Sequence, residues 1–169
     1  TEGQFITRMD ADDIMPTNKL MDLRNALLTK GKGHVAVGFV KYFSAQTLGE
    51  GYVFYENWLN NLTQSENNYA EIYRECVIPS PNFLIHKEDL ESIDAFNPDV
   101  YPEDYDLAFR MYKNDFKVVS TNSLTHYWRD HQNRSTRTQE HYQMLNFIPL
   151  KVSHFVEIEY NASQTLVLW

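Results

Sequence analysis

The sequence predicts a single α/β domain with an at least partly parallel sheet, on three observations. Segments of strand character alternate with segments of helical spacing, and there are no internal repeats or low-complexity stretches. Hydrophobic residues make up 43% and aromatic residues 14% of a 169-residue chain, which is enough for a well-formed core. The longest apolar runs are far shorter than the roughly 20 residues that a membrane-spanning helix needs.

The elements of the first half follow from local composition and spacing. Strands are expected at 4–9 and 34–43, which are rich in β-branched and aromatic residues. A helix is expected over 19–28, where leucines recur at helical spacing and glycines follow. Further helices are expected over 54–62 and within 67–75.

The next part of the chain begins after a proline-broken turn. A short strand is expected at 82–86 and a short helix over 87–93. The segment 104–114 has amphipathic spacing and predicts a helix, which a loop with two prolines precedes. Strand character returns at 116–120 and again from 123 to 131.

The last part of the chain is expected to change from helix to strand. A helix is expected over 137–147, the alternation at 151–160 predicts a strand, and the run at 165–169 predicts the start of another. Pro149 separates the two patterns, so a boundary is expected between residues 1–148 and an extension at 149–169.

Charge and cysteine content narrow the class of partner and the compartment. The formal net charge of −8 argues against a nucleic-acid partner, because phosphate backbones attract basic proteins. The single cysteine, Cys76, excludes an internal disulfide and fits a reducing compartment. With no signal peptide evident, a cytoplasmic location is expected, with the inner face of a membrane as an alternative within it.

Three aspartates follow the first predicted strand. Asp10, Asp12 and Asp13 come at its carboxyl end, where open α/β sheets bind their ligands. Carboxylates concentrated there suit a hard divalent cation, Mg²⁺ or Mn²⁺, that also binds substrate phosphates. Two alternatives stay open at this point. In one, Asp13 caps the following helix and the others are solvated; in the other, an aspartate is a phosphatase-type nucleophile.

A second acidic group opens the helix predicted over 104–114. Glu103 and Asp104 lie at its start, where a carboxylate is held in ordered geometry and can act as a general base. Alternatively, both residues only cap the helix or complement its dipole. A basic and aromatic segment follows later, with His126, Trp128, Arg129 and His131. Arginine can clamp a phosphate and neutral histidine can bind a metal. It is equally open that His126 and Trp128 pack on alternate sites of a strand and that the rest is surface.

In this order and spacing, the motifs resemble family 2 glycosyltransferases of the GT-A type. The segments that carry the resemblance are GQFITRMDADDIMPTNKL, IPSPNFLIHKEDLESIDAFN, YPEDYDLAFRMYKNDFKVVS and LTHYWRDHQNRS. The resemblance covers about residues 1–145. It implies part of a GT-A domain, which is a Rossmann-like nucleotide-diphospho-sugar transferase fold with a mixed sheet flanked by helices.

The resemblance implies a donor-binding role for the aspartates and the basic segment. Asp10 and Asp12 match the D-x-D motif that binds the divalent metal and the diphosphate of a nucleotide-sugar, with Asp12 as the direct ligand. Asp13 matches the acidic residue that often follows this motif. Arg129 and His131 match the late basic segment that closes over the diphosphate, and in some members such a histidine also binds the metal.

The resemblance also implies the chemistry. Asp104, with Glu103 beside it, matches the catalytic base that deprotonates an acceptor hydroxyl, and the reaction is a direct displacement with inversion. The acceptor is a glycan or a lipid-linked hydroxyl, and peripheral membrane association of the full-length protein is compatible with it. Two rivals remain: a Mg²⁺-dependent phosphatase or nucleotidyl-transfer enzyme, and a non-catalytic sugar-binding or interaction module.

The resemblance further suggests that the chain is a fragment. Family members begin with a nucleotide-binding half, and roughly 80–100 residues of this kind have no counterpart before Thr1. The chain by itself is therefore expected to be inactive, and 149–169 to lead into a further domain. The strand before Asp10 is expected to be an open sheet edge, which a homodimer of the fragment would cover.

Overall fold

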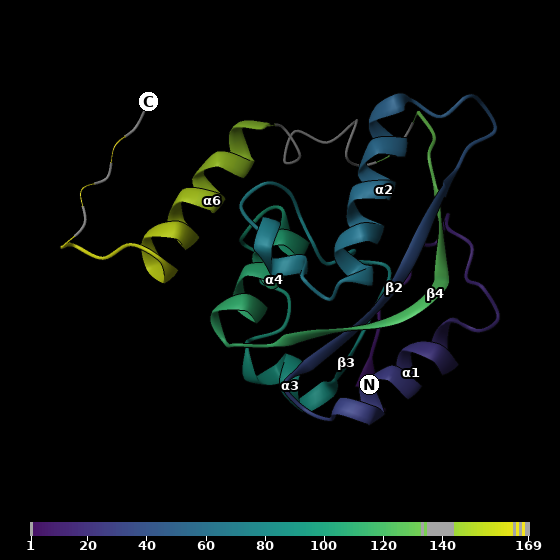
Figure 1. Cartoon of the computed structure of the whole chain (residues 1–169), viewed down its shortest axis with the longest axis horizontal. Helices are drawn as coiled ribbons and strands as arrows, with labels where there is room; N and C mark the ends of the chain where they lie inside the picture. Colours follow the sequence, from purple (N-terminus) through teal and green to yellow (C-terminus); the bar gives the residue numbers. More distant parts are fainter. Residues whose placement is uncertain (1, 133, 135–143, 164, 166, 168–169) are drawn as a thin grey trace.

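The computed structural model describes residues 2–132, 134, 144–163, 165 and 167, and it has the predicted α/β fold (Figure 1). Four strands form one mixed sheet in the order β1-β3-β2-β4. Their bounds are Phe5–Ile6 for β1, His34–Phe43 for β2, Phe83–His86 for β3 and Lys117–Arg129 for β4. Strand β2 runs parallel to β4, and β3 runs antiparallel to both β1 and β2.

Helices cover both faces of this sheet. Their bounds are Lys19–Lys30 for α1, Glu50–Gln64 for α2, Lys87–Ser92 for α3, Glu103–Lys113 for α4 and Met144–Ile158 for α6, with a short 3-10 helix, η1, at Asn68–Glu71. In Figure 1, α1 lies on one side of the crossing pair β2 and β4, and α2 and α4 lie on the other. None of the helices in the described part of the chain is long and apolar enough to cross a membrane.

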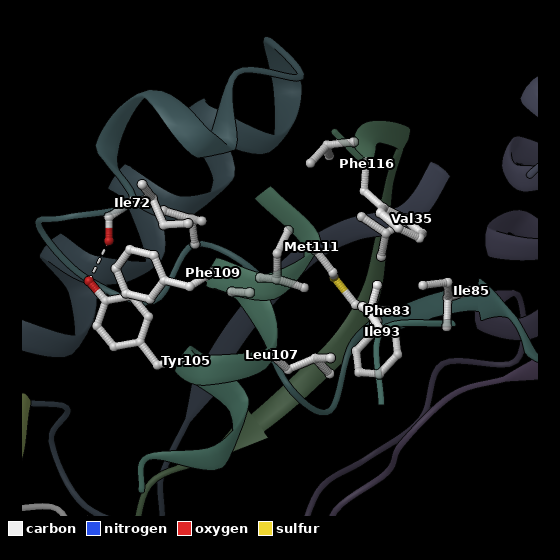
Figure 2. Close-up of a cluster of buried hydrophobic side chains, with 14 of the residues drawn as sticks. Val35, Ile72, Phe83, Ile85, Ile93, Tyr105, Leu107, Phe109, Met111 and Phe116 are labelled. Carbon is white, nitrogen blue, oxygen red and sulfur yellow. Dashed lines mark hydrogen bonds between the residues drawn. The ribbon is translucent and has the colours of Figure 1, made fainter. Parts of the chain in front are cut away.

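Alternation along β2 divides the buried side chains into two cores. Val35 and Val37 face the larger core, to which α4 contributes Leu107, Phe109 and Met111 (Figure 2). Ala36 faces the opposite way and packs with Leu23 and Leu27 of α1, among others. This division follows from the two-residue period of a strand. Figure 2 also shows the Tyr105 hydroxyl donating a hydrogen bond to the carbonyl of Ile72, which joins α4 to the segment after η1.

Most predicted elements are present, with shifts at their ends. Strand β2 has the predicted bounds, whereas β1 is only two residues long. The chain leaves the sheet after Ile6, and the Thr7 hydroxyl donates to the carbonyl of Phe83 at 2.5 Å. The two strand segments expected from 116 to 131 form one strand, β4, which contains a residue of positive φ, Asn122. The helix expected within 67–75 is reduced to the single turn η1.

The predicted strand at 151–160 is wrong, because these residues belong mainly to helix α6. The physical reason is packing: Leu150 and His154 are buried and Ile158 is partly buried, and this is a helical spacing. Pro149 lies inside the helix and does not end it. Of the helix expected over 137–147, residues 137–143 lie outside the described residues, as does much of the segment 165–169.

Candidate functional site

A cleft of about 530 Å³ opens where four segments meet: the loop after β1, the loop before β3, the start of α4 and the end of β4. Six of the seven residues to which the family resemblance assigns a role line it, namely Asp10, Asp12, Glu103, Asp104, Arg129 and His131. The edge strand β1 delivers the aspartate loop, and a bridge between Ile14 and Tyr127 holds that loop against β4. Residues about 120 positions apart therefore share one space.

Asp12 forms the exposed side of the cleft together with the basic segment. His131 Nε2 lies 2.7 Å from Asp12 Oδ2, and this hydrogen bond holds the pKa of the Asp12 carboxyl below its ordinary value. Arg129 Nε donates to the backbone carbonyl of Asp12 at 2.5 Å, and its guanidinium lies 4.6 Å from the centre of the Phe43 ring. Both contacts hold the Arg129 side chain at the rim of the cleft.

The donor set of Asp12 and His131 fits a hard divalent cation that substrate oxygens help to hold. One carboxylate oxygen and one imidazole nitrogen face each other in the cleft. Among the residues that the structure describes, no group of three His, Cys, Asp or Glu side chains is arranged around a common point. Mg²⁺ and similar ions use one or two carboxylates, with phosphate oxygens and water completing the shell. A cation held by Asp12 and His131 would therefore need further oxygen ligands from substrate or water.

Asp13 lies behind the cleft instead of lining it. Its side chain is 1% exposed; His126 Nε2 lies 2.8 Å from Asp13 Oδ2, and the Arg129 backbone N–H donates to Asp13 Oδ1 at 2.7 Å. The cap alternative for Asp13 is also wrong, since Asn18 holds the N-cap position of α1. Asp13 therefore bears on the cleft through its neighbours Asp12 and Arg129.

Arg8 is a cleft residue that the sequence reasoning missed. Its guanidinium lies 3.4 Å from Asp10 Oδ1 through Nε and 3.0 Å from Glu103 Oε1 through Nη1. It thus joins the aspartate loop to the start of α4. Burial raises the pKa of Asp10, and the Arg8 charge opposes this effect. Arg8 is the only cation in the segment 5–14, but this alone does not identify Glu103, 95 residues away, as its partner.

Asp104 has the environment of a general base. Burial, and then the neighbouring Glu103 charge, raise the pKa of Asp104 to about 6. The Tyr105 N–H donates to Asp104 Oδ1 at 2.8 Å and fixes the side chain in the first turn of α4. Pro102, not Asp104, occupies the N-cap position. A partly buried carboxyl that ionises near neutral pH is well matched to accept a proton from a hydroxyl.

An aromatic pocket of about 480 Å³ adjoins the cleft and shares Asp104, Trp128 and Arg134 with it. Trp128 of β4 stacks on Tyr42 of β2, with ring centres 5.1 Å apart and planes 9° apart. Trp128 thus packs within the sheet and also lines the cleft. Asp104 can therefore be reached from a second side, which is lined by aromatic residues.

Comparison with known proteins identifies solved structures that share this fold. The sequence matches no family model and no curated protein. The crystal structure of S. aureus TarS 1–349 in complex with UDP-GlcNAc is similar, with a TM-score of 0.66 at 14% identity, over 96% of this chain and 46% of that chain. The complex of TarS 1–349 with UDP gives 0.58 at 13% identity, over 96% and 44%. The crystal structure of S. aureus TarS gives 0.56 at 16% identity, over 96% and 26%.

These similarities establish the fold. The mixed sheet flanked by helices is shared with part of TarS, and the α/β class predicted from the sequence is confirmed. The chain spans less than half of the length of these TarS chains.

Proposed function

We propose that this chain is the catalytic, acceptor-side portion of a family 2 glycosyltransferase of the GT-A type. The observation that carries the proposal is convergence: Asp12, Asp104 and His131 come from three distant segments and line one cleft. The substrate would be a nucleotide-diphospho-sugar, and its sugar would pass to a hydroxyl of a glycan or a lipid-linked acceptor.

In the proposed reaction, Asp104 accepts the proton of the acceptor hydroxyl while the hydroxyl oxygen forms a bond to the sugar C1. The bond from C1 to the diphosphate oxygen breaks, and its electron pair leaves with the nucleoside diphosphate. Attack from the side opposite the leaving group inverts the anomeric centre. Arg129, at the rim of the cleft, donates hydrogen bonds to the departing diphosphate.

A divalent cation, Mn²⁺ or Mg²⁺, is part of the proposal. Asp12 and His131 would hold it, with Asp10 nearby, and it would supply positive charge to the leaving diphosphate. Arg8 already forms ion pairs with Asp10 and Glu103, so Asp12 is the carboxylate of the cleft most available to such an ion.

The donor and acceptor sides of the cleft differ in chemistry. The TarS structures with UDP-GlcNAc and with UDP support a nucleotide-sugar donor, since UDP is what remains after the sugar leaves. The aromatic pocket beside Asp104 supports an acceptor approach from the other side, because aromatic rings stack on the apolar faces of sugars.

Both rival functions use less of this arrangement. A phosphatase or nucleotidyl-transfer enzyme would need the aspartates but would leave the Glu103–Asp104 helix start without a role. A non-catalytic module requires neither convergence of the acidic groups nor a raised pKa at Asp104.

The test is turnover by the full-length protein. Release of nucleoside diphosphate is measured for a panel of nucleotide-sugars with Mn²⁺, in the wild type and in Asp104→Asn. The proposal expects release from at least one nucleotide-sugar and a large loss in the variant. Turnover of a phosphate ester without use of any nucleotide-sugar would instead support the phosphatase, and equal turnover in Asp104→Asn would refute the base assignment.

A further inference from the structure

Lys19 is fully buried at an unfavourable place, and its contacts suggest a function. It is the first residue of α1, where the helix dipole disfavours a positive charge, and it is 0% exposed. A buried lysine is rare unless it is paired. Lys19 Nζ donates to the carbonyl of Pro81 at 2.5 Å, lies 3.3 Å from His126 Nδ1, and lies 3.5 Å from the sulfur of Met9.

The contacts of His126 indicate which group donates and which accepts in each hydrogen bond of the network. An ammonium group has only donors, so His126 Nδ1 must accept from Lys19. The proton of the neutral imidazole therefore sits on Nε2, which donates to Asp13 Oδ2 at 2.8 Å. The second oxygen of Asp13 accepts from the Arg129 N–H. One positive and one negative charge are thus joined through a neutral histidine, and each hydrogen bond has a donor and an acceptor.

This network lies directly behind the cleft and touches three of its walls. Met9 belongs to the aspartate loop, Pro81 to the loop before β3, and Arg129 to the end of β4, and all three line the cleft. The network joins segments up to 116 residues apart in the sequence. Burial lowers the pKa of Lys19 to about 8, which still leaves it charged at neutral pH.

We propose that Lys19, His126 and Asp13 form a buried positioning relay that holds Asp12 and Arg129 toward the diphosphate side of the cleft. The three residues touch no substrate; they fix the residues next to Asp12 and the backbone of Arg129. This inference rests on the proposed function for the ligand that the cleft binds. The relay itself requires only the hydrogen bonds among Lys19, His126 and Asp13. Groups that orient the binding residues of a site commonly matter almost as much as those residues.

The first experiment tests the relay by measuring the tautomer of His126. It requires neither a variant of Lys19 nor an activity assay. The full-length protein is labelled with ¹⁵N-histidine, and the His126 signals are assigned by their loss in His126→Gln. The relay expects the neutral Nε2–H tautomer at pH 7. A neutral Nδ1–H tautomer, or a fully protonated ring, would overturn it, because Lys19 could not then donate to Nδ1.

The second experiment reads the positioning role through binding of UDP with Mn²⁺. In Lys19→Met the stem of the side chain is kept and the charge is lost, and we expect the Kd to rise about tenfold. Lys30→Met changes an exposed lysine of the same helix and should leave the Kd unchanged. The measurement is made well below the unfolding temperature of each variant, so that a loss of stability alone does not change the Kd of the folded protein.

An unchanged Kd in folded Lys19→Met would refute the positioning role. If the wild type binds no UDP, the donor assignment fails, and the tautomer of His126 alone then decides whether the relay exists. The two failures are therefore distinguishable.

Discussion

Asp104→Asn separates a catalytic carboxylate from a structural one by two measurements with opposite signs. The substitution keeps the shape of the side chain and removes its ability to accept a proton and become neutral. If Asp104 is the general base, turnover should fall by about 10²–10⁴-fold, which is the usual contribution of general-base catalysis. The stability of the folded protein at neutral pH should rise at the same time.

The expected stabilisation follows from the pKa of Asp104. The folded value is about 6 and the ordinary value is 3.8, so ionised Asp104 makes the folded state less stable above pH 6. The difference corresponds to at most about 3 kcal/mol at pH 7.5, and it shrinks to under about 1 kcal/mol at pH 4, where the carboxyl is largely protonated in the folded state. Asp104→Asn should remove this penalty, so its advantage in the free energy of unfolding should disappear as the pH falls.

The assay is urea unfolding of wild type and variant at pH 7.5 and pH 4, beside the pH profile of kcat/KM. The wild-type profile should lose activity as the pH falls through about 6, because the protonated carboxyl accepts no proton. Asp99→Asn, at an exposed aspartate of the loop before α4, is the matched control and should change neither quantity. An Asp104→Asn protein that is inactive but less stable than the wild type at pH 7.5 would refute the reasoning, since the loss would then reflect damaged structure.

Four further outcomes are expected from single substitutions. Glu103→Gln should move the acidic limb of the kcat/KM profile to lower pH, because the Glu103 charge raises the pKa of Asp104; an unmoved limb would contradict this. Asp12→Asn should weaken Mn²⁺ binding in the presence of UDP by more than about tenfold, as measured by calorimetry, and equal affinity would exclude Asp12 as a ligand. Gly38→Ala should lower the free energy of unfolding by about 1–3 kcal/mol, since its Cβ would lie 2.1 Å from a threonine hydroxyl of β4. Gly51→Ala, in open space on α2, should instead be stabilising by up to about 1 kcal/mol.

Sequence patterns predicted correctly those elements whose own residues determine which side chains are buried. Strand β2 was predicted with its observed bounds because valines and aromatic residues fill both of its faces. The later part of helix α6 was missed because V-x-H-x-V-x-I alternates like a strand while Leu150 and His154 also lie at helical spacing. Contact with α4 decides between these periods: His154 stacks on Phe109, with ring centres 4.5 Å apart, and Nε2 bonds to Asp106 Oδ1 at 3.0 Å.

The candidate site was predictable only where residue type and order carried the information. Asp12 and Asp104 could be named because carboxylates after a strand and at a helix start have few chemical uses. Arg8 and Lys19 could not, because their roles depend on partners 95 and 107 residues away. Nothing local distinguishes a lysine that will be buried against a histidine from one that will extend into solvent.

Asp12 and Asp13 show how far identical neighbours can diverge. The family resemblance implies that Asp12 is the direct ligand and that Asp13 only follows the motif, and the chain turns so that Asp12 faces the cleft and Asp13 faces the interior. Inside, the charge of Asp13 is balanced by Lys19 through His126; at the other end of the motif, Arg8 lies beside Asp10. The side chain of Asp12 hydrogen-bonds to a histidine, His131, and the charge of Arg134 acts on it from farther away. A neutral imidazole can exchange that hydrogen bond for a shared metal ion, which an arginine or lysine partner cannot do. The way in which the fold distributes its cations among three aspartates thus selects Asp12 as the metal ligand that we propose.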